Sequence, residues 1–191
     1  MSWAKVEQVR DQVIGLRPVY SSIGNATELI LEGNQVLMDR RGLKAVVQAL
    51  ARNYAVDLGA QRKLVSVWLN KKTLIPFYLG QDRVFIPLKM RHKKTGHDET
   101  YGYADVLFIR EITQTDRRLC QIRLKNDLIL EVISGKGTVL QSQHSGERLL
   151  NLLGNIDMPL TEEDKAVDSI RWMVRTLNKI SQQLDRMEKK A

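Results

Sequence analysis

Apolar residues at helical spacing occupy two segments of the first half of the chain. Val6, Val9, Val13 and Leu16 recur three or four positions apart after Ser2, which is a good capping residue. This spacing predicts an N-terminal helix that ends at Pro18. A second apolar stripe predicts an amphipathic helix and consists of Leu43, Val46, Val47, Leu50, Ala51 and Tyr54. Asp57 is placed to cap a further short helix that reaches Leu69.

Strand-like segments lie between and after these helices, and turn residues separate several of them. Three hairpins are predicted, over residues 26–38, 73–88 and 119–133, together with a strand over residues 100–109. Pro76 and Pro87 cannot donate to a sheet ladder, so both hairpin strands that carry them are expected at an edge or a bulge. Residues 135–138 predict a turn from a strand into a helix.

The last part of the chain is patterned as a long helix from Thr161 onward. The a and d positions of successive heptads are Ile170, Met173, Leu177, Ile180, Leu184 and Met187. This helix either packs on its own domain or pairs two copies of the chain. We therefore predict an α+β fold with an antiparallel sheet of about six strands flanked by helices, over residues 1–156, and a C-terminal helix over 157–191 as a candidate oligomerisation element.

Charge is concentrated in one part of the sequence. The 191 residues contain 30 Lys and Arg against 22 Asp and Glu, which gives a net charge of +8. Thirteen basic residues and only two acids, Asp57 and Asp82, lie between Arg40 and Lys94. Cations at this density repel one another unless an anion neutralises them, so a polyanion such as nucleic acid is the expected partner. A basic surface without a partner is the alternative.

Sequence signatures of an enzyme are absent, and we expect a non-enzymatic protein without a cofactor. The three histidines, His92, His97 and His144, lack neighbours at metal-ligand spacing, so no metal site is predicted. Residues 135–138 lack the first glycine of a phosphate-binding loop. The single cysteine, Cys120, is expected to be a buried thiol in a strand, which suits a reducing, cytoplasmic location. No signal peptide or membrane-spanning segment is predicted.

The long polar loop before Tyr101 is the strongest candidate for a binding element. Arg91 and its neighbours supply cations for phosphates or for a narrow minor groove. Tyr101 and Tyr103 could pack on sugars or stack on bases. Asp98 and Glu99 are expected to be solvated.

Other cations of the basic stretch lie on or before the predicted helices. Arg40 and Arg41 precede a helix whose N-terminus would favour a bound anion. The pairs 62–63 and 71–72 are weaker candidates, because paired basic residues usually face water on amphipathic helices. The candidate nucleic-acid-binding residues are Arg40, Arg41, Lys44, Lys89, Arg91, His92, Lys93, Lys94, Tyr101 and Tyr103.

The order of these segments resembles the competence transcription factors of the ComK type. The resemblance covers residues 26–153 and is carried by residues 82–87, Arg91 and 101–103, followed by 121–134 and 140–143. Tyr103 stands where that family typically has tryptophan, and the N-terminal and long C-terminal helices are additions. The resemblance implies an activator of transcription that binds A·T-rich DNA through the minor groove as a dimer or higher oligomer.

The resulting hypothesis is a DNA-binding transcriptional regulator that contacts double-stranded, A·T-rich DNA through a basic face and acts as a homodimer or higher oligomer. The alternative is an interaction or assembly adaptor whose working surface is the heptad helix. A nucleic-acid-processing enzyme is a third possibility, which the absence of metal ligands and acidic pairs disfavours.

Overall fold

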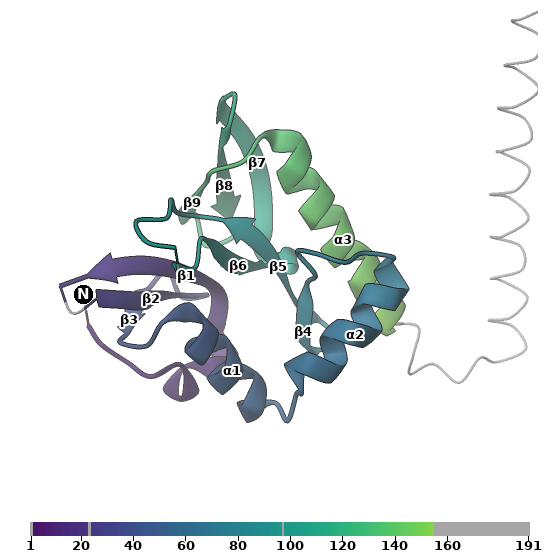
Figure 1. Ribbon diagram of the computed structural model, residues 1–191, viewed down its shortest axis with the longest axis horizontal. Helices are drawn as coiled ribbons and strands as arrows, with labels where there is room; N and C mark the ends of the chain where they lie inside the picture. Colours follow the sequence, from purple (N-terminus) through teal and green to yellow (C-terminus); the bar gives the residue numbers. More distant parts are fainter. Residues whose placement is uncertain (1, 23, 97, 155–191) are drawn as a thin grey trace, which may run out of the picture. The chain divides into compact units, whose positions relative to one another are not determined.

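The fold is α+β, as predicted, and is built on a six-stranded antiparallel sheet. The computed structural model describes residues 2–22, 24–96 and 98–154 (Figure 1). In this part of the chain a second sheet of three antiparallel strands accompanies the first, and three α-helices pack around them. No helix in these residues combines the length and hydropathy needed to cross a membrane.

The large sheet has the strand order β3-β2-β1-β6-β5-β4. Its strands are β1 (Val13–Ser21), β2 (Gly24–Leu31), β3 (Val36–Asp39), β4 (Phe77–Gly80), β5 (Arg83–Lys89) and β6 (Tyr101–Asp105). The small sheet has the order β7-β8-β9, with β7 (Ile109–Asp116), β8 (Leu119–Leu124) and β9 (Ile129–Val132). The helices are α1 (Leu43–Asn53), α2 (Leu58–Leu69) and α3 (Lys136–Gly154).

The large sheet is buried on both faces because each face has its own apolar cluster. Along β5, Val84, Ile86 and Leu88 join the cluster that includes residues of α3 and of the small sheet. Phe85 points the other way, into the cluster that includes α1. This alternation follows from the period of two in a strand. Strand β5 therefore appears in the sequence as one continuous apolar run.

Helix α3 lies close against β5, as its glycine shows (Figure 1). A Cβ atom at Gly146 would be 2.5 Å from a methyl group of Ile86 and 3.2 Å from Val106. Only glycine permits this approach. The hydroxyl of Ser142 on the same helix donates to the carbonyl of Pro87, at 2.9 Å. These contacts bring the first turns of α3 to the edge of β5 that β4 leaves uncovered.

The predicted N-terminal helix is wrong. Residues Val6–Gln8 and Arg10–Gln12 form two short 3-10 turns, and β1 begins at Val13. Strand β1 has residues in both apolar clusters, Val13 and Leu16 in one and Ile14 in the other. In a strand that is buried on both faces, apolar and polar residues no longer alternate, and the apolar positions can match the spacing of a helix. Pro18 is tolerated because β1 pairs with β6 only at Gly15 and Leu16.

Most of the other predicted elements are confirmed. The hairpin of β2 and β3, helices α1 and α2, and the hairpin of β8 and β9 lie close to the predicted ranges. Asp57 caps α2 by accepting from the amides of Gly59 and Ala60. The predicted strand over residues 100–109 is instead divided into β6, a 3-10 turn and the start of β7. The heptad positions Ile170, Met173, Leu177, Ile180, Leu184 and Met187 lie outside the described residues.

Candidate nucleic-acid interface

Asp98 organises the loop between β5 and β6. Its carboxylate accepts hydrogen bonds from the amides of Lys94 and Thr95, at 2.9 and 2.7 Å, and from the hydroxyl of Tyr20. The side-chain amide of Asn25 donates to its other oxygen at 3.3 Å. The Tyr20 hydrogen bond, supported by the amide of Thr95, lowers the pKa of Asp98 well below its ordinary value. The expectation of a solvated Asp98 is therefore wrong, because this carboxylate ties the loop to β1 and β2.

Arg91 is a buried structural residue. Its side chain is 8% exposed, and it donates to the carbonyl of Glu99 at 2.5 Å and to the side-chain oxygen of Asn25 at 3.0 Å. Its guanidinium carbon lies 4.2 Å from the centre of the Tyr20 ring. A side chain held in this way cannot enter a DNA groove without leaving its site. The structure thus contradicts the role predicted for Arg91.

Glu99 supplies the anion that was expected at the N-terminus of α1. Its two carboxylate oxygens accept from the amides of Leu43 and Lys44, each at 3.0 Å. Gly42, at the capping position, has no side chain to do so. A helix N-terminus leaves amides without intrahelical partners, and a carboxylate satisfies them. The anion comes from the loop of the same chain, 55 or more positions away in sequence, and not from a ligand.

Arg41 is neutralised within the protein. Its guanidinium makes a bidentate contact with Glu7, at 2.8 and 2.6 Å, and a second ion pair with Asp39 at 2.6 Å. Hydrogen bonds to Asp39 and then Glu7 raise the pKa of Arg41 above its ordinary value. This arginine fastens the N-terminal turn to the end of β3. Its charge is balanced by these two carboxylates, so Arg41 is not among the unpaired cations of the described residues.

The remaining predicted cations are more accessible. The exposed ones are Arg40, Lys44, His92, Lys93 and Lys94, whereas Lys89 is half-buried. Two of them contact aromatic rings: the guanidinium of Arg40 lies 5.3 Å from the Trp3 ring centre, and the amine of Lys94 lies 4.3 Å from that of Tyr20. None of these six has a carboxylate partner within the described part of the chain.

A groove of about 710 Å³ brings together cations from three separate segments. Lys44 comes from α1, Arg62 from α2 and Lys93 from the loop that follows β5. None of the three makes an ion pair with a described carboxylate. Asp98 and Glu99 also line the groove, but backbone amides already occupy their carboxylates. The floor is apolar and includes Leu43, Val47, Leu58, Ile75 and Phe77.

The two candidate tyrosines both line this groove, but they differ in what they can offer. The ring of Tyr103 packs edge-on against Phe77, with ring centres 5.0 Å apart, and burial raises the pKa of its hydroxyl. Tyr103 is therefore held by packing within the groove wall and is only partly accessible. Tyr101 is half-buried and lines both the groove and a neighbouring smaller cavity. The groove thus offers cations and hydroxyls rather than a stacking platform.

Arg62 and Lys71 belong to the basic pairs that the sequence indicates as weaker candidates. Paired basic residues at these positions indicated a solvated surface, and only the packing of α1 and α2 shows that Arg62 shares a groove with Lys44.

Cys120 is fully buried, as predicted, and burial raises the pKa of its thiol. Among residues 2–22, 24–96 and 98–154, no three His, Cys, Asp or Glu side chains are grouped to hold a metal ion.

Comparisons of the chain with protein-family models, curated proteins and solved structures return no match. The resemblance to the ComK-type factors therefore stays a prediction, and the function has to be argued from the geometry of the site.

Proposed function

We propose that this protein binds nucleic acid, with double-stranded DNA as the expected partner, and that it contacts the phosphate backbone at the groove between α1, α2 and the loop after β5. The observation that carries the proposal is the convergence of Lys44, Arg62 and Lys93 on one groove. These three cations outnumber the two carboxylates of the lining, Asp98 and Glu99, so the groove keeps a net positive charge that a polyanion can neutralise with release of its counterions. The exposed Arg40 and Lys94 add positive charge elsewhere in the same basic stretch of sequence.

The burial of Arg91 supports a mode of binding that differs from the one expected from the sequence. The sequence-based hypothesis places Arg91 in an A·T-rich minor groove, whereas in the structure this residue is buried beneath the loop. Contacts from the remaining lysines and Arg62 are directed to phosphates, which position a protein on nucleic acid without reading its sequence. A role in transcription stays a hypothesis within this proposal. Nothing in the described residues favours the adaptor alternative, because its helix lies outside them.

The proposal is tested by the salt dependence of binding. Fluorescence anisotropy of a labelled duplex, with a single strand of the same sequence in parallel, gives the affinity across a salt series. The variant Lys44→Ala, Arg62→Ala, Lys93→Ala is expected to reduce the log–log slope by up to roughly 0.9 for each phosphate that the protein no longer neutralises. If the single strand binds more tightly than the duplex, the preferred partner is single-stranded nucleic acid, and the groove remains the proposed interface.

A matched control separates the position of the charges from the net charge. The variant Arg117→Ala, Arg118→Ala, Lys125→Ala removes the same number of exposed cations from the turns of the small sheet. It is expected to leave the slope close to that of the unmodified protein. Equal losses in both variants would mean that only net charge matters, and the proposed interface would be wrong. The same conclusion would follow if neither nucleic acid bound.

A further inference from the structure

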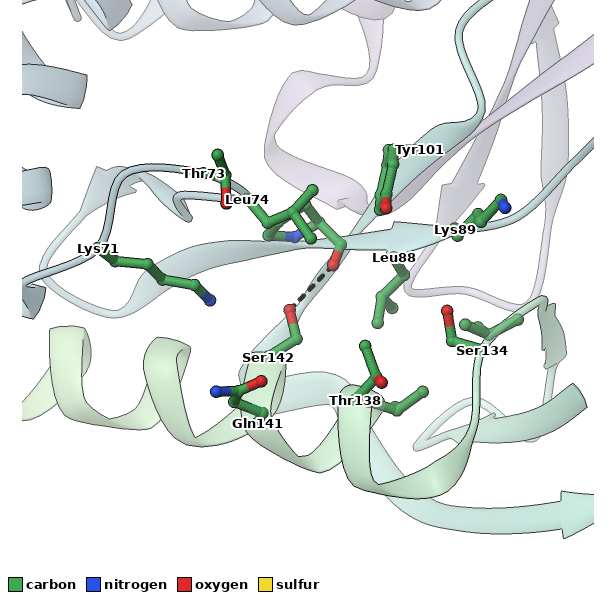
Figure 2. Close-up of a pocket in the computed structure, with 13 residues that line it drawn as sticks. Lys71, Thr73, Leu74, Leu88, Lys89, Tyr101, Ser134, Thr138, Gln141 and Ser142 are labelled. Carbon is green, nitrogen blue, oxygen red and sulfur yellow. Dashed lines mark hydrogen bonds between the residues drawn. The ribbon is translucent and has the colours of Figure 1, made fainter. Parts of the chain in front are cut away.

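A second, smaller cavity lies beside the groove, between the edge of β5 and the first turns of α3 (Figure 2). It has a volume of about 230 Å³ and is lined by no aspartate or glutamate. It shares Leu74, Pro87 and Tyr101 with the groove, so the two spaces adjoin. Strand β4 leaves this edge of β5 open, which is why α3 and the segment after α2 can enclose a cavity there.

Polar groups with unused donors surround the cavity. Figure 2 shows the amine of Lys71 reaching toward Gln141 and Ser142 on α3, with the hydroxyls of Ser134 and Thr138 near the start of that helix. The Lys71 ammonium donates to the hydroxyl of Ser145 at 3.1 Å. An ammonium has three N–H donors. Two of its protons therefore remain for a ligand.

Only one hydroxyl of the cavity lining donates a hydrogen bond to a described residue. Ser142 donates to the carbonyl of Pro87. The other uncharged polar side chains of the lining have no hydrogen bond to a described residue; they are Thr73, Tyr101, Ser134, Thr138 and Gln141. Lys89 is a second lysine of the lining, beside Lys71. Ser134 and Thr138 flank the start of α3, where the helix dipole favours negative charge. Burial lowers the pKa of Lys71, which an anion beside the ammonium would reverse.

We propose that this cavity binds a phosphomonoester group, with Lys71 as the charge partner and the hydroxyls of Ser134, Thr138 and Tyr101 as hydrogen-bond donors. A tetrahedral dianion accepts several hydrogen bonds from different directions, and the lining supplies lysine and hydroxyl donors from several segments of the chain. The volume of about 230 Å³ suits a phosphate with a small attached group. The site does not depend on the proposed nucleic-acid function.

Two sources could supply the same group, a free phosphorylated metabolite or the terminal phosphate of a nucleic-acid strand lying in the adjoining groove. Isothermal titration calorimetry with inorganic phosphate and with ribose 5-phosphate, at constant ionic strength, measures the first source. Duplexes with 5′-phosphate or 5′-hydroxyl ends, compared by anisotropy, measure the second. A preference for the phosphorylated end assigns the site to the strand, and equal binding of the two ends assigns it to the free compound.

The variant Lys71→Met is expected to weaken phosphomonoester binding at least tenfold, because it removes the charge and keeps most of the side-chain volume. Lys72→Met is the matched control, since Lys72 is exposed, adjacent in sequence and not part of the cavity lining. Should Lys71→Met fold poorly, Thr138→Val removes one donor with little change in shape and is expected to weaken binding severalfold. The proposal is overturned if neither phosphate nor ribose 5-phosphate binds and duplexes with 5′-phosphate and 5′-hydroxyl ends bind equally well. It is also overturned if the Lys71→Met and Lys72→Met variants bind the phosphorylated compound equally well. This result is distinguishable from failure of the groove, which is measured by the salt slope of duplex binding.

Discussion

At the scale of single residues, the candidate interface separates cations that stabilise the fold from cations that face solvent. Residue type and spacing do not distinguish the two. Arg91 and Lys93 lie two positions apart in one polar loop, yet the first is buried among Glu99, Asn25 and Tyr20 and the second is exposed. The difference depends on contacts with β1 and β2, some seventy residues earlier in the chain, which local sequence does not reveal.

We therefore expect opposite phenotypes from substitutions at these two positions. Arg91→Met should lower the free energy of unfolding by about 1–3 kcal/mol, because it removes two part-buried hydrogen bonds from a charged donor. Its salt slope for DNA binding should equal that of the unmodified protein. Lys93→Met should change stability by less than about 0.5 kcal/mol and lower the slope. Urea denaturation measures the stability, and anisotropy measures the salt slope. A lowered slope for a folded Arg91→Met protein would show that Arg91 contributes to the interface.

Asp105 gives a prediction about pH. It is fully buried, one carboxylate oxygen accepts from the amide of Leu107, and the other has no partner among the described residues. Burial raises the pKa of Asp105 to about 6. The protonated form is therefore favoured by folding, and this contribution is complete at acid pH and is lost as the pH rises through about 6.

The variant Asp105→Asn mimics the protonated form at every pH. It should unfold with a free energy up to roughly 3 kcal/mol larger than that of the unmodified protein at pH 7.5, and with nearly the same value at pH 4. Thermal and urea denaturation at both values provide the comparison. Glu131→Gln, at an exposed position of β9, is the control and should show no such difference. If Asp105→Asn increased the free energy of unfolding equally at pH 7.5 and pH 4, Asp105 would not titrate in this range.

At the scale of elements, the parts of the fold that were predicted correctly are those with a local physical signal. The stripe of α1, the cap of α2 at Asp57 and the turn residues of the hairpins each act within a few positions. Strand β1 was missed because both of its faces are buried, so its pattern depends on neighbours far away in the sequence. The cap of α1 was missed for the same reason, since Glu99 reaches it from another loop.

The remote cap predicts a rescue experiment. Glu99→Ala should destabilise the protein by about 1–2 kcal/mol, because two amides of α1 lose their acceptor. Adding Gly42→Ser should restore about half of this or more, since serine at the capping position can accept from the same end of the helix. A Cβ atom at Gly42 meets only a Glu99 oxygen at 3.6 Å, so the backbone admits the change. Urea denaturation of the two variants decides the matter, and failure of the serine to recover stability would show that Glu99 acts mainly through its other loop contacts.

At the scale of the whole described chain, the cations of the basic stretch fall into three groups with different surroundings. Arg41 and Arg91 hold segments together, Lys44, Arg62 and Lys93 share a groove, and Lys71 belongs to a cavity of hydroxyls. Composition predicts a polyanionic partner, but it does not assign the individual cations, because each assignment depends on which carboxylates and carbonyls the fold brings near.

This distribution leads to a prediction about specificity. Arg91 is buried, and the cations that line the groove are Lys44, Arg62 and Lys93, to which the proposed function assigns phosphate contacts. Phosphate contacts carry no base information, whereas each good base contact is worth about 1–3 kcal/mol of discrimination. We expect A·T-rich and G·C-rich duplexes of equal length to bind within about threefold of each other, a difference below about 0.7 kcal/mol. Competition anisotropy at a single salt concentration measures this ratio. A preference of tenfold or more for A·T-rich DNA would show that side chains outside the groove, such as His92 or Lys94 on the exposed loop, read the minor groove in place of Arg91.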